Sequence, residues 1–248
     1  FKWLKIKTDS IGLAFEGSIE NWDVKSGGCN LFKCTTNSQN IFNSGINPVR
    51  NNNLVGSISL PITWYLANPL EISFTPKMVF LPSTQGNSSG SGEFYGDNAG
   101  IGFGISYKPI NRFKTYASSF IPLGPGNNSF NNNLVYERKT IFTGGINYAL
   151  DTKISFEGYI TNGFGDSPST SILTLPSGNQ ILYGTRIIYK PTNEDWEIIP
   201  EDYQPSKLRY GGLSVGNSEI INSEETRFKG GLDNKGTWWG RFDWGISN

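Results

Sequence analysis

The stretch Ala99-Gly100-Ile101-Gly102-Phe103-Gly104-Ile105-Ser106-Tyr107-Lys108-Pro109 carries its larger, mostly apolar side chains at every second position as far as Tyr107. Only glycine and serine lie between them. A period of two is that of a β-strand, and here one face is apolar while the other is nearly bare. Pro109 cannot donate a hydrogen bond to a neighbouring strand, so the strand is predicted to end at this Tyr-Lys-Pro sequence.

The same strand ending recurs along the chain. Its tyrosines are spaced by 42, 41 and 41 positions and close the stretches Ile62-Thr63-Trp64-Tyr65, Gly104-Ile105-Ser106-Tyr107, Gly145-Ile146-Asn147-Tyr148 and Ile187-Ile188-Tyr189. A fixed period of this size indicates one supersecondary unit used repeatedly. We expect each unit to be a strand, a short turn, a returning strand and a longer polar loop.

Composition narrows the function classes. The 248 residues carry 21 basic and 21 acidic side chains, and this balance argues against a nucleic-acid binder. Thirty glycines and 14% aromatic residues suit an all-β protein with many turns. The mean hydropathy is −0.35, and no apolar run approaches the ~20 residues of a membrane helix, although a β-barrel gives a much weaker hydropathy signal.

The two cysteines, Cys29 and Cys34, lie five positions apart in a polar stretch. A local disulfide would fit an oxidising compartment, and two free loop thiols are the alternative. Two cysteines and no histidine argue against a structural zinc site, and no metal or cofactor is expected.

Two asymmetries decide the fold class. Short turns follow Tyr65, Tyr107 and Tyr148, whereas long polar loops follow the returning strands. Several predicted strands are also a dozen residues or longer, above the usual five to six or so. Long alternating strands with short turns on one rim and long loops on the other are typical of an antiparallel, up-and-down transmembrane β-barrel, here of about 10–12 strands.

On this architecture the chain resembles bacterial outer-membrane β-barrel proteins, porin-like in style, over Lys5 to Tyr189. The resemblance implies the outer membrane of a Gram-negative-type bacterium and contact with its lipid. The recurrent Tyr65, Tyr107, Tyr148 and Tyr189 would then form an aromatic girdle at one membrane interface. Many such proteins end in an aromatic residue, whereas this chain ends at Asn248 and starts at Phe1, so we expect a processed form or a piece of a longer protein.

Domain limits follow the repeat. Residues 1–191 are predicted to hold the hairpin repeat, and residues 192–205 an acidic, proline-containing connection. Residues 206–248 would supply further strands or begin another segment. A four-stranded propeller has a similar period, but its strands are short. A soluble sandwich or lipocalin-like barrel would need a solvated exterior, which the glycine face of the opening stretch does not resemble.

Nothing in the sequence indicates catalysis. Without histidine, the Ser-His-Asp and Cys-His mechanisms are excluded. The glycines of the opening stretch lie within a strand and lack the following Lys-Ser/Thr of a phosphate loop. We therefore expect a protein that is not an enzyme.

Alternation instead predicts a set of lumen-facing residues opposite the aliphatic face: Glu16, Lys153, Glu157, Tyr159, Arg186 and Arg209. Such charges would set the selectivity of a pore, or would form salt bridges that fill a narrow barrel. The first functional hypothesis is a channel for ions or small polar solutes, saccharides included. The second is a non-conducting surface or polysaccharide-export barrel, and the third is a soluble binding module. The sequence leaves the oligomeric state open.

Overall fold

The computed structural model describes residues 2–26, 29–30, 33–34, 49–67, 69–84, 94–110, 112–131, 133, 135–151, 153–164, 167–174, 180–191, 226–234 and 238–244. This part of the chain is all-β and is built around one large antiparallel sheet of twelve strands. The strands of the sheet are β1 (Lys2–Lys7), β2 (Ile11–Ser26), β5 (Val49–Ser59), β6 (Ile62–Ala67), β7 (Leu70–Phe80), β8 (Asn98–Ile110), β9 (Phe113–Pro125), β12 (Ile141–Ala149), β13 (Ile154–Thr161), β16 (Leu182–Tyr189), β17 (Thr226–Asp233) and β18 (Trp238–Trp244).

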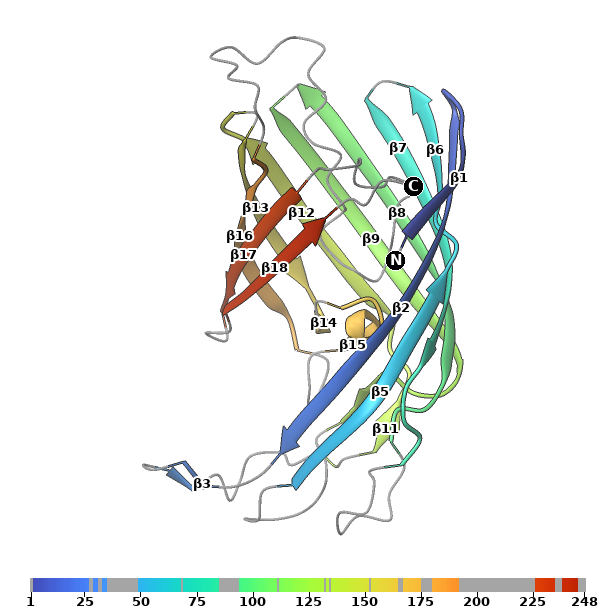
Figure 1. Cartoon of the computed structure of the whole chain (residues 1–248), viewed down its shortest axis with the longest axis vertical. Coiled ribbons are helices and arrows are strands. Elements are labelled where there is room, and N and C mark those ends of the chain that lie inside the picture. Colours follow the sequence, from blue (N-terminus) through green and yellow to red (C-terminus); the bar gives the residue numbers. More distant parts are fainter. Residues whose placement is uncertain are drawn as a thin grey trace.

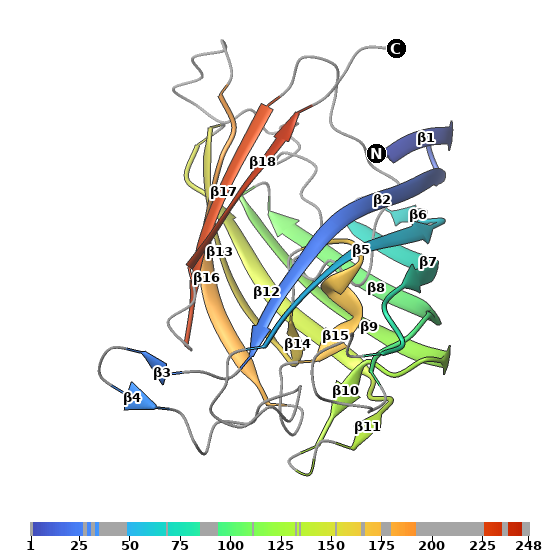
Figure 2. The same cartoon turned by 60° about the horizontal axis from the view of Figure 1, so that its bottom comes forward.

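The sheet is an up-and-down meander in which successive strands pair. Its order is β1-β2-β5-β7-β8-β9-β12-β13-β16-β17-β18, and β6 also pairs with β2 and β7. β5 and β6 are two halves of one strand, interrupted at Leu60-Pro61, where proline removes a backbone donor. Figures 1 and 2 show that the sheet curls strongly around a concave side.

The two edges of the sheet are β1 and β18. In the described part of the chain no ladder joins them, so a closed barrel is not seen there. The sheet includes β17 and β18 from the region after residue 205, whereas residues 192–225 lie outside the described part.

Short elements complete the fold. They are β3 (Cys29–Asn30), β4 (Lys33–Cys34), β10 (Ser129–Phe130), β11 (Tyr136–Glu137), β14 (Gly163–Phe164), β15 (Leu173–Thr174) and one 3₁₀ turn, η1 (Thr170–Ile172). β3 pairs with β4, β10 with β11, and β14 with β15. The segment containing η1 and β15 lies inside the curl of the sheet in both views (Figures 1 and 2).

The polarity of the two sheet faces is the reverse of that in a soluble β-protein. On the outer, convex face Ile19 is 79% exposed and Leu54 is 76% exposed. The same face carries further exposed apolar side chains on all the long strands, among them Ile58, Met78, Phe80, Phe103, Ile105, Ile121, Phe142, Ile146, Phe156, Ile160, Ile187, Phe228 and Phe242. Ile101, Phe103 and Ile105 therefore point outward, as the alternation predicts.

The inner, concave face is largely buried and largely polar. Its buried side chains include Ser57, Ser59, Thr63, Ser73, Thr75, Lys77, Ser106, Lys114, Ser118, Thr143, Asn147, Ser155, Glu157, Thr161 and Lys229. The glycines of the opening stretch belong to this face. Gly100 is required there by its neighbour, because a Cβ at this position would lie 2.8 Å from Cε1 of Phe120. The bare face thus accommodates an aromatic ring from the adjacent strand.

Candidate functional site

The inner face holds a band of hydrogen-bonded charged residues. At one end of the band, on β7, Oε2 of Glu71 accepts hydrogen bonds from Ser106 Oγ of β8 at 3.1 Å and from Lys114 Nζ of β9 at 3.2 Å. The three residues face one another because strand alternation places them on the concave side of adjacent strands. Glu71 and Lys114 are therefore charged groups that compensate each other within the curl.

The other end of the band is centred on Glu157 of β13. Arg186 of β16 is its register partner, and Nη2 of Arg186 lies 3.0 Å from Oε1 of Glu157. The hydroxyl of Tyr116 on β9 also donates to Oε1 of Glu157. The guanidinium carbon of Arg186 lies 4.9 Å from the ring centroid of Tyr159, within cation–π range. One carboxylate thus organises residues from three strands.

Asn147 of β12 lies between the two groups. It pairs in register with Lys114 on one side and with Glu157 on the other, and it is only 2% exposed. Within the described residues neither polar atom of its amide has a hydrogen-bond partner. We call the whole set the polar belt: Glu71, Ser106, Lys114, Tyr116, Asn147, Glu157, Tyr159 and Arg186.

Two glycines create the space for the aromatic members of the polar belt. A Cβ at Gly145 would lie 2.5 Å from Cζ of Tyr116, and a Cβ at Gly184 would lie 2.6 Å from Oη of Tyr159. Each glycine is the direct register partner of the tyrosine concerned. The absence of a side chain lets each ring lie against the neighbouring strand, which brings the hydroxyl of Tyr116 to Glu157.

A second inward feature is the segment Ser167–Thr174, which we call the inner segment. It belongs to the connection between β13 and β16, yet its N-terminal half makes polar contacts with the opposite side of the curl. Glu20 of β2 accepts hydrogen bonds from the backbone N–H of Ser169 at 2.9 Å, from the Ser169 hydroxyl at 2.8 Å and from the Ser167 hydroxyl. Nζ of Lys77 on β7 donates to Ser171 Oγ at 2.8 Å.

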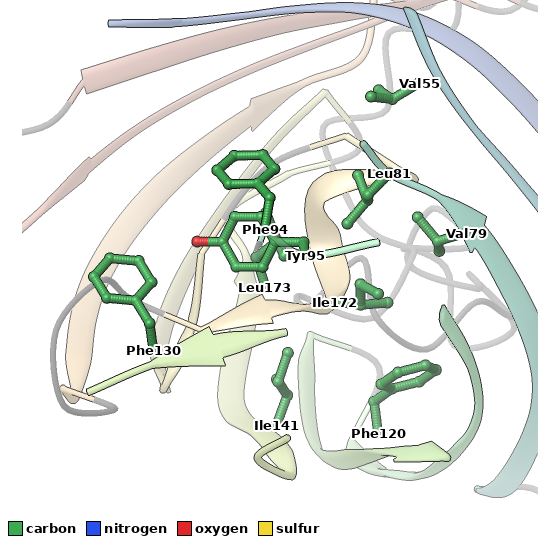
Figure 3. Close-up of a cluster of buried hydrophobic side chains, with 10 residues drawn as sticks. All are labelled: Val55, Val79, Leu81, Phe94, Tyr95, Phe120, Phe130, Ile141, Ile172 and Leu173. Atoms are coloured by element: carbon green, nitrogen blue, oxygen red, sulfur yellow. The ribbon is translucent and has the colours of Figure 1, made fainter. Parts of the chain in front are cut away.

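The inner segment is also fixed by apolar contacts. Ile172 and Leu173 are almost fully buried in a cluster, which we call the loop cluster, with Val55, Val79, Leu81, Phe94, Tyr95, Phe120, Phe130 and Ile141 (Figure 3). Burial in this cluster, together with the nearby Tyr136, raises the pKa of Tyr95 far above its ordinary range. Asn128 donates through Nδ2 to the carbonyl of Ile172 at 2.8 Å. The long-loop end of the curl is therefore packed with side chains.

The polar belt brings together three of the predicted lumen residues, Glu157, Tyr159 and Arg186. Glu16 is also on the inner face, on β2, where its Oε2 accepts a hydrogen bond from Ser59 Oγ at 3.4 Å. Lys153 precedes β13 in the turn that contains Asp151, and its carbonyl accepts a hydrogen bond from the Lys190 N–H. Arg209 lies outside the described residues.

The four recurrent tyrosines do not share one face. Tyr107, Tyr148 and Tyr189 lie on the outer face and are each more than 40% exposed. Tyr65 is paired in register with the inward Glu71 and is two residues from the buried Thr63, so it lies on the inner face. The recurrence of the Tyr ending takes no account of strand alternation, which places Trp64 rather than Tyr65 outward.

The paired cysteines can be placed only by their backbone. Cys29 and Cys34 are direct register partners in the β3–β4 hairpin, and their side chains lie outside the described part. Direct partners in an antiparallel pair have Cα atoms about 4.5–5.5 Å apart, which is compatible with a disulfide. The disulfide remains a prediction.

Glu71, Lys114, Tyr116 and Glu20 are site residues that sequence reasoning did not identify. The faces of β9 could not be assigned because Thr115 and Ser119 interrupt the apolar alternation of its outer face. Glu20 could have been found, since it continues the inward series of Glu16 and Ser18 by one step. Among the described residues there is no group of three or more His, Cys, Asp or Glu side chains that could hold a metal ion.

Comparison of the chain with protein families, with curated proteins and with solved structures found no match. None of the helices in the described part is long and apolar enough to cross a membrane.

Proposed function

We propose that this chain forms a transmembrane β-barrel of the bacterial outer-membrane type and acts as a channel for small polar solutes or ions. The inverted polarity of the sheet carries the proposal. Apolar side chains are exposed along the outer face of every long strand, while Ser, Thr, Asn and charged side chains are buried inside. Such a sheet would expose a continuous apolar surface to water, whereas in a bilayer the same surface is solvated by lipid.

Barrel closure is part of this proposal. In hydrocarbon an open sheet edge leaves backbone groups unsatisfied, so β1 and β18 would have to meet. The antiparallel path has eleven strand positions when β5 and β6 are counted as one. β1 and β18 consequently run in the same direction, and their pairing would be a single parallel seam in an odd-stranded barrel. Odd strand numbers occur among membrane barrels, although single-chain bacterial barrels have even ones.

Conduction requires an open path through the interior of the barrel. About eight strands fill their own interior, whereas sixteen or more leave an open channel. This sheet lies between those limits, and the inner segment and the loop cluster occupy one end of the curl. That observation favours a second candidate, a non-conducting surface or assembly barrel.

The deciding experiment is to purify the protein in detergent, to test for heat-modifiable migration on a gel and to record single-channel currents in a planar bilayer. A channel gives discrete conductance steps. Glu157→Lys should then shift the reversal potential in asymmetric salt toward anion preference, because it places a second positive charge beside Arg186. A folded, heat-modifiable protein that never conducts would support the second candidate.

A further inference from the structure

We propose that the inner segment is a displaceable plug, latched to the opposite wall by Glu20 and Lys77, and that its release opens the path through the barrel. This inference rests on the proposed channel function. The interior then has two parts: the polar belt, which belongs to the wall of the barrel, and the inner segment, which can leave it.

The latch consists of polar contacts between distant parts of the chain. Glu20 accepts hydrogen bonds from serines about 150 residues away in the sequence. Lys77 donates to Ser171, which is 94 residues away. The hydroxyl of Ser18 adds a bond of 3.0 Å to Ser169 Oγ. Because these bonds join the loop to the wall and are not made within a strand ladder, they can break without disturbing the sheet.

The sequence of the inner segment suits this role. Three serines at alternate positions, Ser167, Ser169 and Ser171, all reach the latch residues. Hydrogen bonds to a charged partner contribute more than neutral ones, so Glu20 and Lys77 provide the strongest polar contacts of these serines. The C-terminal end of the inner segment is held separately. Ile172 and Leu173 are buried in the loop cluster, Ile172 and Thr174 are hydrogen-bonded to Asn128, and β15 pairs with β14.

The polar belt lies on the wall and is independent of this latch. Its ion pairs, Glu71–Lys114 and Glu157–Arg186, join adjacent or near-adjacent strands of the same side of the sheet. Removal of the inner segment would therefore leave the belt in place as the lining of the path. The latch controls access, and the belt is the surface that a solute would meet.

The test uses labelling and conductance in parallel. Cys29 and Cys34 are first replaced by serine, and Ser171→Cys then reports exposure of the inner segment to a membrane-impermeant maleimide. Ser171 is 4% exposed, so labelling of the latched protein should be slow. Glu20→Ala should accelerate it about tenfold or more, because three hydrogen bonds to the carboxylate are lost. Glu71→Gln is the control, since this inward carboxylate is hydrogen-bonded to Ser106 and Lys114 of the wall.

A locked variant completes the test. Ser18 and Ser169 are replaced by cysteines in the same background, because their hydroxyl oxygens lie 3.0 Å apart and a disulfide should form. Oxidation should abolish conductance and reductant should restore it, while Glu20→Ala should raise the open probability. Faster labelling in Glu20→Ala without any conductance would uphold the displaceable segment and reject the channel. Unchanged labelling in Glu20→Ala, or equal and non-zero conductance of the oxidised and reduced locked variant, would overturn the plug.

Discussion

Nη2 of Arg186 lies 3.0 Å from Oε1 of Glu157 on the adjacent strand, and both side chains are largely shielded from solvent. The Tyr116 hydroxyl donates to the same carboxylate. Breaking a buried pair by removing one partner leaves the other charge uncompensated, which is costly.

Glu157→Ala is therefore expected to lower the free energy of unfolding by about 3 kcal/mol. Urea unfolding in lipid vesicles, followed by tryptophan fluorescence, measures it. In the double variant Glu157→Ala/Arg186→Met the loss should be smaller than the sum of the two single losses. Glu137→Gln is the control: its pair with Lys139 is much more accessible to solvent, so less than about 1 kcal/mol should be lost. Equal effects at Glu157 and Glu137 would contradict a buried pair.

Gly145 and Gly144 offer a comparison of two adjacent positions on opposite faces. A Cβ at Gly145 would lie 2.5 Å from Cζ of Tyr116 and 2.8 Å from the carbonyl oxygen of Gly158, whereas a Cβ at Gly144 meets nothing nearer than 3.8 Å. We expect Gly145→Ala to destabilise by about 1–3 kcal/mol and Gly144→Ala by less than about 0.5 kcal/mol. The same unfolding assay decides, and similar values for the two variants would rule out tight packing of Tyr116.

The sequence predicted the sheet better than it predicted the site. Alternation in β8, β12, β13 and β16 is unbroken, so the inward and outward residues of these strands, including Glu157 and Arg186, could be assigned before the structure. Alternation fails as a guide in β9, where the outer face mixes Thr115, Ala117 and Ser119 with Ile121, so the inward Lys114 and Tyr116 could not be assigned.

The inner segment could not have been predicted by any local pattern. Its position depends on contacts with Glu20 and Lys77, which are far away in sequence, and a Ser/Pro-rich stretch is equally compatible with a solvated loop. Tyr65 shows that a local pattern can also mislead. The recurrent motif predicted that Tyr65 and Tyr107 occupy equivalent positions, but strand register places Tyr65 on the inner face. Repeats indicate the unit, whereas register determines the face.

Cys29 and Cys34 are expected to form a disulfide, since they are direct partners in the β3–β4 hairpin. Alkylation of the native protein before and after reduction, followed by mass spectrometry, tests the bond: two alkyl groups should be added only after reduction. The unfolded, reduced protein serves as the control for full alkylation. Complete alkylation without reductant, in protein taken from its native compartment, would show two free thiols.

Insertion into a membrane can be tested with arginine substitutions at two depths on the outer face. Ile105 and Tyr107 are both outward on β8 and have nearly equal exposure, 45% and 46%, but Tyr107 is two residues closer to the short-turn rim. In a bilayer the cost of a charge depends on depth, so Ile105→Arg should lose about 2–4 kcal/mol and Tyr107→Arg only about 0–1 kcal/mol beyond the loss of the ring. Ile105→Leu and Tyr107→Leu are the controls for lost shape.

The comparison is made by urea unfolding in phosphatidylcholine vesicles, with the same variants in detergent as a reference. In a water-soluble barrel both positions would face solvent, and each substitution would change stability by less than about 0.5 kcal/mol. A small and equal effect at the two positions would therefore reject the transmembrane barrel. A large loss of stability for Ile105→Arg and a small one for Tyr107→Arg would mean that an apolar phase surrounds Ile105 and ends near Tyr107. This is what a bilayer around the exposed apolar face of the sheet would produce.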